Sequence, residues 1–208
     1  MTAVIFDCDG TLVDSEPLAR TAWVQALAPY GYAVTDADID GAVGLPYERV
    51  HGYFAQRAAL PPAADFWPEY SRELFALIES GLVVFEDAAG TARELQARGV
   101  PLAVASSSPR ERLHRTLQRV ELLDAFDATV AGDEVARGKP EPDMYLVAAE
   151  RLGVDPGDCV AIEDSPPGVA AAVAAGMATV AICRVPGTEA TLAAADRVVD
   201  VLSAAGIL

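Results

Sequence analysis

The chain has 208 residues, 52% of them apolar, and a formal net charge of −16 at pH 7. The apolar share suffices to bury a core, which excludes a disordered chain, and the length fits one large domain or a domain with a sizeable insertion. The negative charge argues against nucleic acid and anionic lipid, so we expect neither nucleic-acid nor membrane partners.

The first predicted element is a buried strand over residues 3–7 (AVIFD), and two carboxylates, Asp7 and Asp9, stand at its end. Side chains alternate along a strand, so Asp7 and Asp9 share a side while the chain stays extended, and Cys8 points into packing. Two neighbouring carboxylates repel strongly at low dielectric. They coexist if a cation lies between them or if one is protonated; alternatively, each accepts backbone N–H groups in a turn.

The rest of the chain divides into a helical stretch and an alternating stretch. Residues 16–81 carry apolar side chains at helical spacing and no convincing strand. Beyond residue 85, strands are expected at 101–106, 128–132, 159–164 and 178–183, and helices at 88–98, 109–119, 142–152 and 166–175. This predicts an α/β fold: a Rossmann-like parallel sheet with helices on both faces (residues 1–15 and 84–208), with a small α-helical cap (16–83) inserted after the first strand.

Two further polar segments begin at or near the ends of predicted strands. In VASSSP (104–109), an apolar strand ends in hydroxyls, and Ser108 is the expected N-cap of a helix beginning at Pro109. In RGKPEPDMY (137–145), Lys139 precedes a proline-rich turn whose backbone is fixed by its rings. Capping serines and a solvated lysine are the simple alternatives to a role in a site.

A third segment, VAIEDSPPGV (160–169), places Glu163 and Asp164 at a strand end, with Ser165 as the N-cap of the next helix. Adjacent strand residues point to opposite faces, so both acids contact one cation only if the strand ends there. Asp164 is the preferred metal ligand, and Glu163 either binds the metal directly or supports its ligands. The alternative is an acidic pair stabilised by the dipole of the helix.

These four segments, starting with DCDGTLVDSE (7–16), resemble in kind and order the motifs of the haloacid dehalogenase superfamily, in its DxDGT phosphotransferase branch, over nearly the whole chain. The resemblance implies that Asp7 is a nucleophile that forms an aspartyl-phosphate, and that Asp9 is the general acid and base. Gly10 and Thr11 would shape the turn around the phosphate.

The same resemblance implies the remaining parts of the site. Ser106 and the N–H of Ser107, together with Thr11, would bind the phosphate, and Lys139 would pair with both the nucleophile and the phosphoryl group. The implied Mg²⁺ ligands are Asp7, the backbone carbonyl of Asp9, and Asp164, with Glu163 as a direct or indirect ligand. Hard oxygen ligands suit Mg²⁺, and a chain with two histidines offers little for a zinc centre.

The predicted cap resembles the α-helical type of this superfamily, whose members close over the site and choose the substrate. In GAVGLPYERVHGYF (41–54), Gly44, Tyr47 and Arg49 are the candidate substrate contacts. Arg49 as a surface residue and Tyr47 as ordinary packing are the alternatives.

The resemblance also narrows the reaction. A histidine that β-phosphoglucomutases carry near the start of the cap is replaced by Ala19, which favours hydrolysis over mutase activity. Asp9 argues against a dehalogenase, and the absence of lysine from residues 16–83 argues against a phosphonatase.

We therefore expect a Mg²⁺-dependent phosphatase that hydrolyses a small phosphorylated metabolite, a sugar phosphate, through an aspartyl-phosphate. A hexose-phosphate mutase of the β-phosphoglucomutase type is the first alternative, and an inactive binding protein with the same fold is the second. The chain is expected to be a monomer. Its three cysteines are far apart in the sequence, so we expect reduced thiols. The N-terminal segment is neither basic nor a long apolar run, so we expect a cytoplasmic protein.

Overall fold

A computed structural model describes residues 2–41 and 47–207 of the chain. It consists of two compact units, which we call the core unit (Met1–Asp14 and Val84–Leu208) and the helical unit (Ser15–Val83). The chain passes between them through the short strands β2 (Val13–Asp14) and β3 (Val83–Val84). Within the described parts of the chain, no helix combines the length and the apolar character that a membrane span requires.

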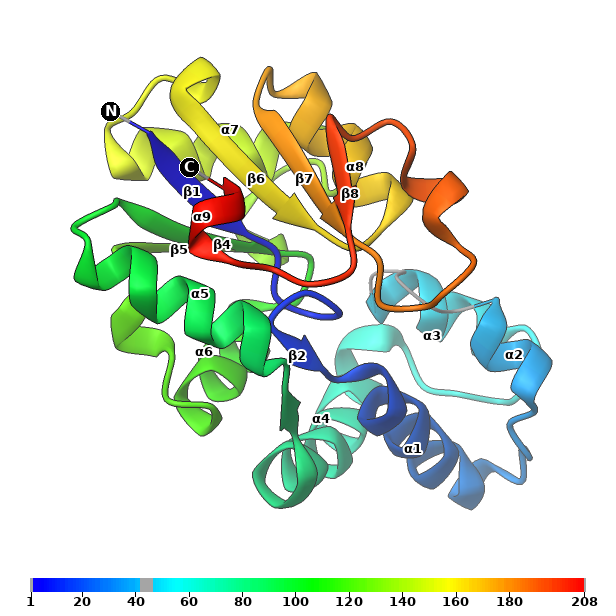
Figure 1. The fold of residues 1–208 in the computed structure, drawn as a ribbon. Coiled ribbons are helices and arrows are strands. Elements are labelled where there is room, and N and C mark those ends of the chain that lie inside the picture. The colour runs from blue at the N-terminus through cyan, green and yellow to red at the C-terminus, as the bar shows by residue number, and fades with distance from the viewer. Residues whose placement is uncertain (1, 42–46, 208) are drawn as a thin grey trace. The chain divides into compact units, whose positions relative to one another are not determined.

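The core unit is built on a parallel six-stranded sheet with the order β5-β4-β1-β6-β7-β8 (Figure 1). The strands are β1 (Ala3–Phe6), β4 (Leu102–Ser106), β5 (Ala128–Ala131), β6 (Cys159–Glu163), β7 (Ala178–Ile182) and β8 (Arg197–Val199). Val4 of β1 is level with Leu102 on one side and Val160 on the other. Because the strand order reverses at β1, the crevice beyond its carboxyl end is where such sheets bind ligands.

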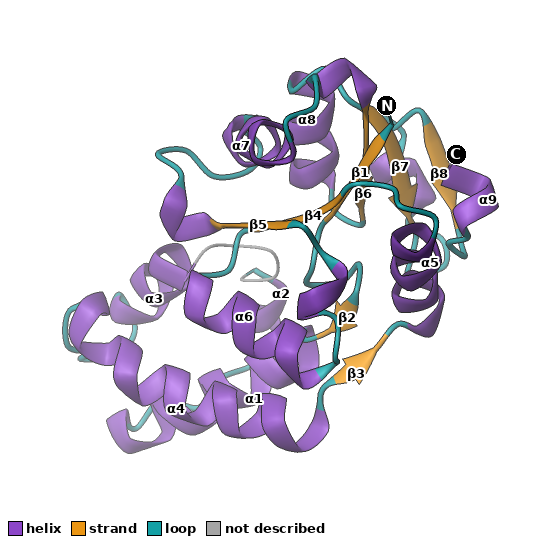
Figure 2. Ribbon diagram, turned by 90° about the vertical axis from the view of Figure 1, so that its left-hand side faces the viewer, coloured by secondary structure: helices purple, strands orange, loops and turns teal. Residues whose placement is uncertain are grey.

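Helices cover both faces of this sheet, as the edge-on view shows (Figure 2). On one face lie α7 (Asp143–Leu152) and α8 (Pro166–Ala174), and on the other lie α5 (Glu86–Ala97) and α6 (Arg110–Arg119), with α9 (Ala204–Ile207) packed against α5. Alternate side chains on β1 and β4 face α7 and α8, and most of them are alanines, so the helices approach closely; the buried residues there include Ala3, Ile5, Ala103, Ala105, Ala148 and Ala171. The predicted α/β fold class is confirmed.

The helical unit has a core of aromatic side chains. It contains α1 (Glu16–Leu27), α2 (Asp36–Asp40), α3 (Tyr47–Ala55) and α4 (Ala63–Gly81). Trp23 of α1 lies at its centre, with ring centroids 4.3 Å from Tyr70 and 5.1 Å from Phe54. Stacked and tilted rings at these distances stabilise beyond the area that they bury.

The elements differ from the predictions at a few points. Strand β8 was not predicted, because three residues at the edge of the sheet, flanked by Asp196 and Asp200, give too short an apolar pattern. Short 3-10 helices also occur at Ala28–Tyr30, Leu123–Ala125, Gly132–Glu134, Pro156–Asp158 and Glu189–Leu192. The three cysteines are buried and free, as expected.

Candidate active site

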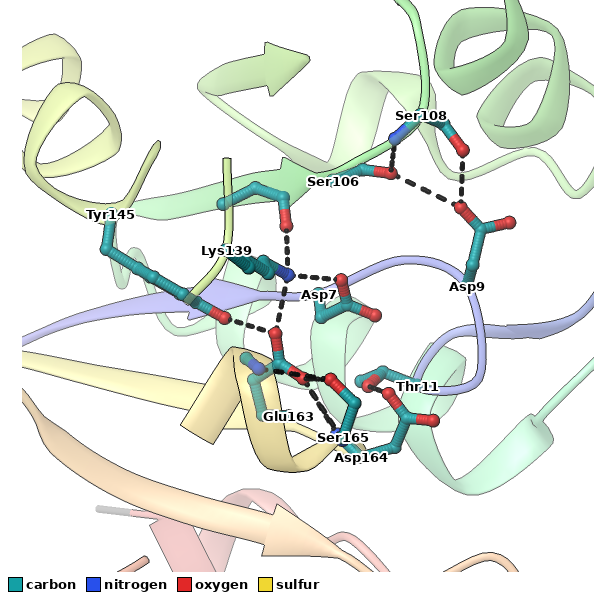
Figure 3. Close-up of polar contacts among 12 residues, drawn as sticks. Asp7, Asp9, Thr11, Ser106, Ser108, Lys139, Tyr145, Glu163, Asp164 and Ser165 are labelled. Atoms are coloured by element: carbon teal, nitrogen blue, oxygen red, sulfur yellow. Dashed lines mark hydrogen bonds and ion pairs between the residues drawn. The ribbon is translucent and has the colours of Figure 1, made fainter. Parts of the chain in front are cut away.

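A buried lysine joins the ends of three neighbouring strands. Lys139, the single lysine of the chain, donates from Nζ to Asp7 Oδ1 at 2.6 Å, to the carbonyl of Ala105 at 3.1 Å, and to Glu163 Oε1 (Figure 3). Its side chain is only 6% exposed. The three acceptors stand at the carboxyl ends of β1, β4 and β6, so one cation holds together the strand ends at the point where the strand order reverses.

The charges of this group shift one another's proton affinity. Burial raises the pKa of the Asp7 carboxyl to about 7, with Lys139 acting in the opposite direction and the charge of Glu163 adding to the rise. Burial alone would lower the pKa of Lys139, but its two acidic partners outweigh burial and hold that pKa well above the ordinary value. The ammonium group of Lys139 is therefore charged, and this one positive charge is shared by two carboxyl groups, Asp7 and Glu163.

Glu163 is fully buried and uses both of its carboxylate oxygens. Its Oε1 accepts from Lys139 and from the hydroxyl of Tyr145 at 2.8 Å, and its Oε2 accepts from Ser165 Oγ at 3.0 Å and from the N–H of Asp164 at 3.1 Å. Gly168 on α8 makes room for it, since a Cβ there would lie 1.9 Å from Oε1. The carboxylate is thus held rigidly behind the lysine.

Three acids of the core unit could share a metal ion. Ligand oxygens of Asp7, Glu163 and Asp164 lie within 4.8 Å of one another (Figure 3). Asp7 Oδ2 is buried and, among the residues that the structure describes, has no hydrogen-bond partner. Mg²⁺ binds hard oxygen ligands such as carboxylates, so an unpartnered buried carboxylate oxygen beside a further carboxylate fits this ion.

The turn after β1 passes directly over this group. Gly10 has φ +90°, and a Cβ on it would lie 2.1 Å from Asp164 Oδ2, so both its backbone conformation and its surroundings require glycine. Thr11 follows it, and its hydroxyl lies 3.4 Å from Asp164 Oδ1. The predicted motif residues Gly10 and Thr11 therefore line the same site as the acids.

Asp9 has a different set of partners from Asp7. Its Oδ2 accepts from Ser108 Oγ at 2.8 Å and from Ser106 Oγ at 3.3 Å (Figure 3). Its Oδ1 accepts from Arg112 Nη2 at 2.8 Å. The strand ends at Phe6, so the extended geometry that would align the two carboxylates stops before Asp9. The Asp9 side chain accordingly turns toward the segment between β4 and α6.

The serines after β4 form one corner of the site. The expectation that Ser108 caps α6 is wrong: α6 begins at Arg110, Pro109 takes the N-cap position, and the Ser108 hydroxyl donates to Asp9 instead. The Ser108 hydroxyl thus binds the distant Asp9 carboxylate in place of the backbone N–H groups at the start of α6. Ser106 is buried, and its Oγ accepts from the N–H of Ser108 at 3.1 Å. Ser107 is half-buried between them. The other predicted cap is confirmed, since Ser165 Oγ accepts from the N–H of Gly168.

Two side chains in the site were missed from the sequence, Arg112 and Tyr145. Arg112 is one of several arginines on α6, and nothing in the local pattern separates it from its neighbours. Tyr145 belongs to the segment 137–145 that the sequence singled out, but no role was predicted for it; its hydroxyl is fully buried and takes Glu163 as its partner.

The candidate substrate contacts of the predicted cap belong to the helical unit. Gly44 lies outside the described residues. Tyr47 donates from its hydroxyl to the carbonyl of Ala63 at 2.7 Å, and its ring stacks on Trp23 at 5.9 Å, so it packs within the unit. Arg49 is exposed. Their role toward a substrate stays a prediction.

Comparisons with known proteins agree on one family. Residues 1–176 match the family model of haloacid dehalogenase-like hydrolases. The chain is 36% identical over 191 residues to a probable pseudouridine-5'-phosphatase of Drosophila melanogaster, covering 88% of this chain and 81% of that protein. It is 33% identical to the phosphorylated carbohydrates phosphatase of Thermotoga maritima, covering 85% and 82%. The crystal structure of CbbY from Rhodobacter sphaeroides in complex with phosphate superposes with a TM-score of 0.87 at 28% identity, covering 97% and 94%.

Proposed function

The chain belongs to the haloacid dehalogenase-like hydrolase family, and from that premise we propose that it is a Mg²⁺-dependent phosphatase that hydrolyses a small sugar phosphate through an aspartyl-phosphate on Asp7. The observation that carries the proposal is the Lys139 ammonium group, which holds the Asp7 carboxylate at 2.6 Å beside a second acid pair. The charged lysine opposes the rise in the pKa of Asp7 that burial causes, and so favours the ionised, nucleophilic form of this carboxylate.

The first chemical step is transfer of the phosphoryl group to Asp7. A carboxylate oxygen of Asp7 attacks phosphorus, the bond from phosphorus to the ester oxygen breaks, and that oxygen takes a proton from Asp9 as the alcohol leaves. Lys139, which donates to Asp7, would also donate to the phosphoryl oxygens, whose charge spreads in the transition state, and the Ser106 hydroxyl and the N–H of Ser107 would be the further donors.

The second step returns the enzyme to its starting state. Asp9, now ionised, takes a proton from a water molecule whose oxygen attacks phosphorus. The bond between Asp7 and phosphorus breaks, and inorganic phosphate leaves with the Asp7 carboxylate restored. One residue thus serves as acid and then as base, which splits one difficult displacement into two easier steps.

A bound Mg²⁺ would offset the negative charge of the phosphoryl oxygens and orient them toward Asp7. Asp7, Asp164 and the backbone carbonyl of Asp9 would hold it. Glu163 would support these ligands indirectly, because its oxygens already accept from Lys139, Tyr145 and Ser165.

Removing divalent metal should abolish phosphatase activity, and adding Mg²⁺ back should restore it. Because Mg²⁺ would bind the folded state alone, we also expect the thermal unfolding midpoint to rise with Mg²⁺ concentration. Thermal unfolding of the metal-free protein, titrated with MgCl₂, measures this without substrate. Asp164→Asn should lose most of the rise, whereas Asp158→Asn, an exposed acid of the same unit, should keep it. Full activity after exhaustive chelation would contradict a metal requirement.

We expect Asp9→Asn to lower the turnover of an alkyl phosphate by roughly 10²–10⁴-fold, because an asparagine amide can neither protonate the leaving oxygen nor deprotonate water. Steady-state release of inorganic phosphate measures the loss. Wild-type rates in this variant would show that Asp9 is not the group that moves the proton.

A panel of phosphorylated sugars and nucleotides, assayed for phosphate release with Mg²⁺, tests the proposed function itself. Turnover of at least one sugar phosphate is expected. Conversion of a hexose 1-phosphate to its 6-phosphate faster than phosphate release would identify a mutase, and absence of turnover across the panel would overturn the phosphatase.

A further inference from the structure

Arg112 forms an ion pair with the residue that moves the proton in the proposed reaction. It lies in the first turn of α6, and its Nη2 is 2.8 Å from Asp9 Oδ1. The Arg112 side chain is 16% exposed and that of Asp9 is 24% exposed. Ser108 and Ser106 donate to the other oxygen of Asp9, so the segment from β4 to α6 holds the whole carboxylate.

The ion pair differs from those of Arg110 and Arg115 on the same helix. Arg110 pairs with Glu134 and Arg115 pairs with Glu111, and both arginines are 44% exposed. The pair of Arg115 is exposed at both ends, and such pairs contribute little to structure, whereas the pair of Arg110 has an exposed arginine and a shielded acid. Arg112 is the more shielded arginine, and its pair links residues 103 positions apart, so it fixes one side chain of the site rather than the helix surface.

Asp9 needs such a support because of its place in the chain. The strand pairing of β1 in the six-stranded sheet ends at Phe6, and Asp9 stands in the turn beyond it, where its backbone forms an isolated bridge with Val13 and its side chain is directed by Arg112, Ser108 and Ser106. Proton transfer requires the carboxylate within hydrogen-bond reach of the reacting oxygen, and an error of about 1 Å can cost on the order of 10²-fold in rate.

We infer that Arg112 is a positioning residue for proton transfer: together with Ser108, it sets where the Asp9 carboxylate stands in the candidate active site, without itself contacting the reacting atoms. This inference rests on the proposed function, in which Asp9 protonates the leaving oxygen. Loss of Arg112 should therefore slow the hydrolysis of substrates whose leaving oxygen needs the proton from Asp9, and should spare substrates whose leaving group departs without a proton.

Two aryl phosphates separate these cases. Phenyl phosphate and p-nitrophenyl phosphate differ only in the nitro group, which lets p-nitrophenolate leave without a proton. The ratio of kcat/KM for p-nitrophenyl phosphate to that for phenyl phosphate therefore reports leaving-group protonation. It excludes the later hydrolysis of the aspartyl-phosphate, because kcat/KM covers steps only up to release of the phenol.

We expect Arg112→Ala to lower kcat/KM for phenyl phosphate by roughly 10–100-fold and that for p-nitrophenyl phosphate by less than about threefold. Arg112→Lys should recover part of the loss, since an ammonium group can replace one of the hydrogen bonds but not the planar fork. Arg115→Ala on the same helix should leave both substrates unchanged. Combined with Asp9→Asn, Arg112→Ala should have no further effect on the ratio.

Each other outcome overturns the inference. Equal losses for both substrates would mean that Arg112 contacts the phosphate directly, and unchanged kinetics would make the ion pair structural only. If Arg112→Ala does not fold, Ser108→Ala removes the neighbouring hydrogen bond on Asp9 and must raise the ratio in the same direction. The proposed function is tested separately by Asp9→Asn. If this variant leaves the ratio unchanged, Asp9 is not the general acid of the proposed function. If Asp9→Asn raises the ratio and Arg112→Ala does not, only the role of Arg112 is overturned.

Discussion

Asp7→Asn is expected to lower kcat by roughly 10⁴-fold or more, the largest single effect in this protein, because an amide cannot attack phosphorus. The substitution keeps the size of the side chain and leaves an oxygen for Lys139, so the fold should survive. Steady-state phosphate release with Mg²⁺ gives the rate, and circular dichroism with thermal unfolding checks the fold. Asp65→Asn, the same chemical change at an exposed position of the helical unit, should retain wild-type turnover.

Trapping the intermediate locates the nucleophile independently of the rate. Wild-type enzyme quenched in acid during turnover and reduced with borohydride should carry homoserine at position 7, because the reagent reduces an acyl phosphate and not a free carboxylate. Peptide mass spectrometry finds the modified position. Homoserine at another aspartate, or turnover retained in Asp7→Asn, would refute nucleophilic attack by Asp7.

Much of the architecture was predictable because strands of a buried parallel sheet have continuous apolar sequences. The strands that flank the site, β1, β4 and β6, appear within a residue of their predicted ranges. The edge strand β8 was not predicted, because a three-residue element takes its structure from its pairing with β7 rather than from its own pattern.

The sequence indicated most residues of the candidate site but only some of the contacts between them. Lys139 and Asp7 are 132 positions apart, and only the resemblance to a family suggested that they meet. Ser108 shows the limit of local reasoning: its position before a helix indicated an N-cap, but in the folded chain its hydroxyl donates a hydrogen bond to Asp9. Arg112 was missed for the same reason: its partner lies in a turn that no local pattern connects to α6.

Lys139→Met is the second large effect that we expect, with turnover lowered by roughly 10²–10³-fold through loss of the donor for the phosphoryl group. It should also destabilise the fold by about 3–5 kcal/mol at neutral pH, because the buried Asp7 and Glu163 lose their shared cation. Chemical denaturation measures the stability. Arg137→Met, two positions away and 61% exposed, is the matched control and should change neither quantity much.

The pH dependence of the same variant tests why the lysine is there. Burial raises the pKa of Asp7 and Lys139 opposes that rise, so removing the lysine must raise the pKa of Asp7 further. The nucleophile is the ionised carboxylate, whose fraction falls as pH drops through its pKa. In Lys139→Met the acid limb of the kcat/KM profile should therefore move to higher pH, and raising the pH should recover part of the lost activity. Lys139→Arg keeps the charge and should hold the limb near its wild-type place, even if the larger head group lowers the rate. An acid limb at the same pH in wild type and Lys139→Met would show that the lysine binds phosphate without controlling the ionisation of Asp7.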